Sequence, residues 1–144
     1  MNPDTPSMEV CKRLAAAGWP QDPNTGTREF WFENTVVGKF EPWLGTHRDV
    51  LNVLDDDEVR HYAAPTIGEM LAEVTRRDWG VELVRERVRD YYTVRLYGPP
   101  RTASFALTPG TGLVEAISKS PADALALALA LCAAVEEAKN GRGT

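Results

Sequence analysis

The chain has 144 residues, 43% of them hydrophobic and 26% charged, with a formal net charge of −5. These values fit one folded domain over residues 1–144 with a genuine core. The acidic balance argues against general nucleic-acid binding, and the longest apolar run is too short to span a membrane. Residues 1–4 lack the basic and apolar regions of a secretory signal, so a cytoplasmic protein is expected.

The first predicted helix covers residues 5–17, with Thr5 or Ser7 as its N-cap. Cys11 falls on the apolar face of this helix, and Cys132 falls on an apolar face of the last predicted helix. Two cysteines in a chain of this size do not make a disulfide framework. We therefore expect two buried free thiols, with an activated thiol at Cys11 as the less favoured alternative.

An aromatic hairpin is predicted next, because residues 28–33 alternate in polarity and residues 35–40 read as a second strand. Residues 41–63 show no regular pattern and predict an irregular loop, in which residues 50–54 could supply one short helix or strand. This loop carries an acidic run made of Asp55, Asp56, Asp57 and Glu58. A solvated acidic loop is expected there, with docking on a basic protein surface as the functional alternative.

A clear amphipathic helix begins after Pro65. Thr66 and Glu69 have the spacing of a capping box, and apolar residues follow at helical spacing as far as Val74. This helix is expected to run to about Arg77.

Four strands are predicted in a row after this helix. They cover residues 81–89, 91–97, 102–107 and 113–118, and their short connections require antiparallel pairing. The sequence thus predicts an α+β fold. Its antiparallel sheet would be a meander of about four strands plus the N-terminal hairpin, covered by helices in an αβα-sandwich-like arrangement.

The last predicted helix spans residues 120–140, and its apolar side chains form two stripes. The longer stripe contains Ala124, Leu127, Leu131, Ala134, Val135 and Ala138, and we expect it to pack on a sheet. The shorter stripe contains Leu125, Leu129 and Cys132. It needs a cover, which either residues 8–17 or a second copy of the chain would supply, so a homodimer stays open.

One candidate binding surface lies on the central strands. Arg85, Arg87 and Arg89 occupy alternate positions and so project from one side of a strand, and Tyr91, Arg95 and Tyr97 continue or neighbour that surface. Arginine forks and tyrosine rings suit an anionic ligand, a stacked base or a protein contact. The simplest alternative is an exposed strand surface whose charge is partly balanced by glutamates.

Catalytic and metal-binding motifs are missing from the sequence. The histidines His47 and His61 stand outside HExxH and CxxC patterns, although His61 lies near the acidic run. Gly110 and Gly112 lack the third glycine of a dinucleotide-binding fingerprint, so a hairpin turn is favoured. No Walker A or GxSxG motif is present. We expect a protein that is not an enzyme and that uses no cofactor and no metal.

Two stretches carry a resemblance to a known group of proteins. Residues 63–71, AAPTIGEML, resemble the Pro-Thr helix start common in small phage and prophage proteins, and residues 120–129, SPADALALAL, resemble their closing helix. The order of helix, tyrosine-bearing strands and closing helix is similar to phage αβα-sandwich proteins of unassigned function. The resemblance covers residues 63–140 and brings no catalytic residues.

The leading hypothesis from the sequence is therefore a non-enzymatic binding protein. The resemblance implies a phage or prophage accessory protein that binds or inhibits a host protein in the cytoplasm of the host cell. The alternative is a sponge or carrier for an anionic, nucleotide-like small ligand that binds the arginine and tyrosine surface.

Overall fold

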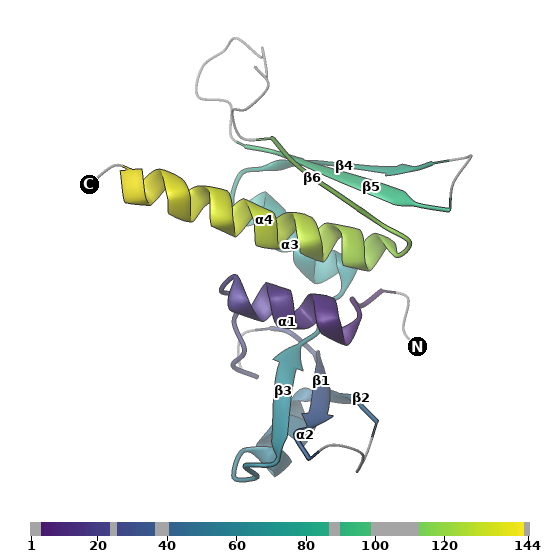
Figure 1. Ribbon diagram of the computed structural model, residues 1–144, viewed down its shortest axis with the longest axis vertical. Coiled ribbons are helices and arrows are strands. Elements are labelled where there is room, and N and C mark those ends of the chain that lie inside the picture. Colours follow the sequence, from purple (N-terminus) through teal and green to yellow (C-terminus); the bar gives the residue numbers. More distant parts are fainter. Residues whose placement is uncertain (1–3, 24–25, 37–40, 87–89, 99–112, 143–144) are drawn as a thin grey trace.

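The computed structural model (Figure 1) describes residues 4–23, 26–36, 41–86, 90–98 and 113–142, with the backbone alone for residue 113 and residues 134–142. Its elements are α1 (Met8–Ala16), β1 (Glu29–Asn34), β2 (Trp43–Thr46), α2 (His47–Val53), β3 (Val59–Ala63), α3 (Ile67–Arg76), β4 (Gly80–Arg85), β5 (Tyr92–Tyr97), β6 (Leu113–Ser118) and α4 (Pro121–Arg142). Both sheets are antiparallel. The first has the strand order β2-β1-β3 and the second has the order β4-β5-β6.

The elements are stacked in layers along the long axis of the molecule (Figure 1). The second sheet is followed by α4 and α3, then by α1, and then by the first sheet with α2. In the first sheet, α1 packs against β3, and α2 packs against β1 and β2. The predicted α+β class, with antiparallel strands covered by helices, is confirmed, but the strands divide between two small sheets.

The stretch expected to be an irregular loop contains three regular elements. Residues 41–63 form β2, α2 and β3, and both strands pair with β1, through Phe30 opposite Gly45 and Phe30 opposite Ala63. The loop prediction was wrong for β2 and β3, because strands of four and five residues carry little local signal and are stabilised by pairing with β1, whereas the short element allowed at residues 50–54 overlaps α2. The expected partner strand at 35–40 lies partly, and the expected strand at 102–107 entirely, outside the described residues.

Local signals located α1 and α3 well. The capping box of α3 is confirmed, because Glu69 N donates to Thr66 Oγ1 at 3.1 Å and Thr66 N donates to Glu69 Oε1 at 2.8 Å. Helix α1 begins after Ser7, whose backbone N donates to Asp123 Oδ1 at 2.6 Å. That bond joins the first turns of α1 and α4, and the two helices run in the same direction (Figure 1).

The shorter stripe on α4 is covered within the single chain, which is one of the two expected arrangements, whereas the longer stripe does not lie wholly in the core as expected. Leu125, Leu129 and Cys132 of the shorter stripe are buried within the single chain, whereas Leu131 of the longer stripe is 48% exposed. Fully buried alanines at 122, 124, 126 and 128 explain this placement, because their small side chains let neighbouring elements pack close to α4. Because α4 is apolar on nearly every side, its sequence alone does not show which side faces the core.

The buried face of α4 belongs to the larger of two hydrophobic cores, together with residues of α1, α3, β5 and β6. The smaller core, formed by Phe30, Phe32, Val50 and Ala63, lies between the first sheet and α2. Cys11 and Cys132 are buried thiols that do not form a disulfide, as predicted. In the described part of the chain, no helix combines the length and apolar character needed to cross a membrane.

Candidate functional site

The acidic run belongs to an exposed surface that we call the α2 tip, made of Leu51, Leu54, Asp55, Asp56, Asp57 and Glu58. Helix α2 lies at the opposite end of the molecule from the second sheet (Figure 1). Leu51 and Leu54 are 59% and 58% exposed. Because they are three residues apart in a helical backbone, they share one face. The tip therefore presents two apolar side chains beside four exposed carboxylates.

Helix α2 is held in place at its start and on its buried face. The Asp49 carboxylate accepts hydrogen bonds from Thr46 N at 2.8 Å and from Thr46 Oγ1 at 3.2 Å. Val50 is fully buried in the smaller core. The two exposed leucines thus project from a helix with fixed position, and exposing them costs hydration free energy that a partner could recover.

Hydrogen bonds also fix the acidic turn between α2 and β3. Asp56 Oδ1 accepts from Glu58 N at 2.9 Å, and the Asp56 carbonyl accepts from Val59 N at 3.2 Å. The Glu58 carbonyl accepts from Thr35 Oγ1 at 3.0 Å. The carboxylates are therefore presented by an ordered turn and not by a long flexible loop.

The two histidines are not part of the α2 tip. The His61 ring packs edge-on against Phe30, with ring centroids 5.9 Å apart, and His47 is an exposed residue at the start of α2. Among the described residues, no group of three or more histidine, cysteine, aspartate or glutamate side chains has a geometry that could hold a metal ion.

The predicted arginine and tyrosine surface is described only in part. Arg87 and Arg89 lie outside the described residues, so the row that they would form with Arg85 is not seen. Arg85 is exposed and its Nη2 lies 3.7 Å from Asp90 Oδ1. Tyr91 is exposed just before β5.

Arg95 and Tyr97 bind carboxylates on the outer face of the second sheet. Arg95 Nη1 lies 3.0 Å from Glu82 Oε1, and Arg95 Nε lies 2.7 Å from Glu115 Oε2. The Tyr97 hydroxyl donates to Glu82 Oε2 at 3.1 Å. One arginine is thus bracketed by two glutamates from neighbouring strands, which weakens the case for an anionic ligand at this point.

Cys11 does not have the properties of an activated nucleophile. Burial, with a smaller contribution from the Asp123 charge, raises the pKa of the Cys11 thiol to about 12. The thiolate is the reactive form, so a fully buried, neutral thiol is a poor nucleophile. The burial of Cys11 therefore serves packing.

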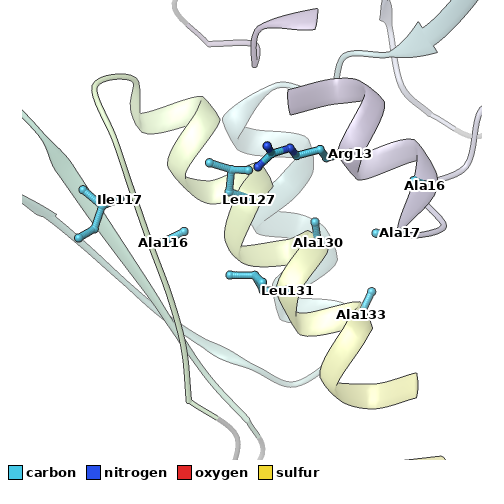
Figure 2. A pocket seen from close by; sticks show the side chains of 9 residues that line it. All are labelled: Arg13, Ala16, Ala17, Ala116, Ile117, Leu127, Ala130, Leu131 and Ala133. Carbon is cyan, nitrogen blue, oxygen red and sulfur yellow. The ribbon is translucent and has the colours of Figure 1, made fainter. Parts of the chain in front are cut away.

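A groove, which we call the α1–α4 groove, opens beside the exposed face of α4 (Figure 2). It has a volume of about 520 Å³. It is lined by Arg13 and Ala16 of α1, by Ala17 directly after α1, by Ala116 and Ile117 of β6, and by Leu127, Ala130, Leu131 and Ala133 of α4. The sequence pattern missed this groove, because it assigned Leu127 and Leu131 to the core. Only the placement of α1 and β6 around α4 shows that these leucines remain partly uncovered.

Comparisons with protein-family models, with curated proteins and with solved structures found no match to this chain.

Proposed function

We propose that this is a non-enzymatic binding protein that docks on another protein through the α2 tip. The observation that carries the proposal is the pair of leucines, each more than half exposed, on a helix held by Val50 and Asp49. Single exposed apolar residues are normal on a protein surface, but adjacent ones in a fixed arrangement mark interaction surfaces. The four neighbouring carboxylates restrict the choice of partner.

The chemistry of the tip defines the partner. Leu51 and Leu54 fit an apolar depression, and the acidic turn fits a rim of lysine or arginine around it. Complementary charge at an interface accelerates association and rejects partners of the wrong sign. The protein would act by covering a basic-rimmed surface of its partner, which requires no catalytic residue.

The resemblance of residues 63–140 to phage and prophage proteins supports the biological setting of this proposal. A small acidic protein that covers a functional surface of a host protein would be an accessory factor or an inhibitor. The proposal places it in the cytoplasm of the host cell, where such a partner is found.

Affinity capture from a bacterial lysate, followed by titration calorimetry with the recovered protein, tests this proposal. We expect one basic-surfaced protein to be retained by the natural chain and lost with the double variant Leu51→Ser/Leu54→Ser. Leu83→Ser is the matched control, because Leu83 is 50% exposed on β4 in the second sheet. That control should retain the partner.

The acidic turn is tested separately with Asp55→Asn/Asp57→Asn. This variant should slow association, and the difference from the natural chain should shrink as salt is added, because exposed charges are screened. A partner that binds the double leucine variant and the natural chain equally well contradicts docking through the tip. Recovery of no specific protein contradicts the proposed function as a whole.

A further inference from the structure

The α1–α4 groove is a second surface that the proposed function does not use. Its floor is α4, and its walls are α1 on one side and β6 on the other (Figure 2). Helix α4 and the α2 tip are separated by α1 and the first sheet (Figure 1). The groove can therefore be considered, and tested, independently of the tip.

Small side chains create the open space in this groove. Ala16 and Ala17 face it from the end of α1 and the residue after it, and Ala130 and Ala133 face it from α4. They leave Leu127 half-buried and Leu131 48% exposed on the floor. Eight of the nine lining residues are apolar, so the groove offers an apolar body a place out of water.

Arg13 is the one charged residue in the lining. It lies in the last turn of α1, and its guanidinium reaches over the groove toward Leu127 (Figure 2). In the described ranges of the chain, no carboxylate pairs with it. A guanidinium with a free planar fork binds a carboxylate through two parallel hydrogen bonds.

We propose that the α1–α4 groove binds a small amphipathic monocarboxylate, whose apolar body lies along Leu127 and Leu131 and whose carboxylate pairs with Arg13. The volume of about 520 Å³ falls within the range of roughly 300 to 1,000 Å³ of small-molecule sites. The single cation selects a monoanion. A phosphate or a nucleotide would require further donors, and the other lining side chains supply none.

The proposal is tested with decanoate, added below its micelle-forming concentration and followed by two-dimensional amide NMR spectra. Decanoate should shift the resonances of residues 116–117 and 127–133 in a saturable way. Decyltrimethylammonium has a tail of the same length and the opposite charge, so it should bind at least about 10-fold more weakly. That ratio is the size of effect expected for a hydrogen bond to a charged group.

Two variants of the groove distinguish the contribution of the ligand's carboxylate to binding from that of its apolar body. Arg13→Gln should weaken decanoate binding by about 10-fold or more and abolish the preference for the carboxylate. Leu131→Asn should weaken both probes equally, because it removes apolar floor without changing charge. Arg48→Gln is the control, since Arg48 is an exposed arginine on α2, away from the groove, and binding should be unchanged.

Several outcomes would overturn the assignment. These are equal binding of the two probes, undiminished binding by Arg13→Gln, shifts confined to other parts of the chain, or no shift at all. Self-association that Leu131→Asn abolishes, measured by light scattering, would show that a second copy of the chain occupies the groove instead. Each result is independent of whether the α2 tip binds a protein.

Discussion

At the scale of single residues, Leu129 and Leu131 show how differently two neighbouring leucines of one helix are placed. Leu129 is 3% exposed in the larger core, and Leu131 is 48% exposed beside the α1–α4 groove. Placing a charge at a buried apolar position costs far more than at a half-exposed one, because the charge loses its water. The two positions thus form a natural pair for locating the core face of α4.

We predict that Leu129→Asp destabilises the chain by more than about 3 kcal/mol, whereas Leu131→Asp stays within about 1 kcal/mol of the natural chain. Thermal melting followed by circular dichroism measures both. The longer stripe, and with it Leu131, was expected in the core from the sequence, so unfolding by Leu131→Asp would restore that earlier assignment and contradict the structure. Leu131→Ala is the control for loss of side-chain volume without added charge.

A second residue-scale prediction concerns the start of α3. Thr66→Ala removes the oxygen that accepts from Glu69 N, and it should lower the free energy of unfolding by about 1 kcal/mol. Thr66→Ser keeps the hydroxyl and should be close to neutral. Denaturant titration measures this change, because a shift of the midpoint without a change in the denaturant dependence of the unfolding free energy reports stability. Equal midpoints for Thr66→Ala and the natural chain would mean that the cap contributes nothing to stability.

At the scale of elements, the junction of β2 and α2 depends on a glycine. A Cβ atom added to Gly45 would lie 2.7 Å from Asp49 Oδ2 and 2.7 Å from Phe32 Cε2. Both neighbours are constrained, since Asp49 holds the start of α2 and Phe32 is fully buried. The close approach of strand and helix at this point therefore requires the absence of a side chain.

We predict that Gly45→Ala destabilises the chain by about 1–3 kcal/mol, the usual cost of overpacking. Gly68→Ala is the matched control. Gly68 is exposed in the first turn of α3, and the nearest atom to its added Cβ is Thr66 Oγ1 at 3.9 Å, so alanine should be neutral or stabilising there. Urea titration of both variants gives the comparison, and equal effects at the two glycines would contradict the steric argument.

Some helices and strands could be predicted from the sequence, and others could not. Caps and helical spacing identified α1, α3 and α4, and alternation with turn residues identified β1, β4, β5 and β6, because these signals are local. The short strands β2 and β3 were missed, since pairing with β1 stabilises them, and α2 was anticipated only as one possible short helix or strand at residues 50–54. The acidic part of the α2 tip was visible in the sequence, but the exposure of Leu51 and Leu54 and the existence of the α1–α4 groove depend on tertiary placement.

At the scale of the whole molecule, α1 connects the two hydrophobic cores. Its Leu14 is buried in the larger core beside α4. Toward the first sheet, Lys12 Nζ lies 2.6 Å from Glu33 Oε2 and 5.6 Å from the centre of the Tyr62 ring. Trp19, which follows α1, packs against both cores. Because one side of α1 packs against the larger core and the other side contacts the first sheet, α1 couples the stability of these two parts of the molecule.

We therefore predict that the chain unfolds as one cooperative unit. Phe32→Ala removes a fully buried ring from the smaller core and should cost about 3–5 kcal/mol, and Leu96→Ala in the larger core should cost about 2–5 kcal/mol. Hydrogen exchange at increasing denaturant, read by mass spectrometry on separate peptides of β1 and β5, reports on each sheet. In both variants the two peptides should lose protection together, because α1 cannot leave the first sheet without disturbing its packing on α4. If Phe32→Ala exposes β1 while β5 keeps the protection of the natural chain, α1 does not couple the cores and the chain contains two independent folding units.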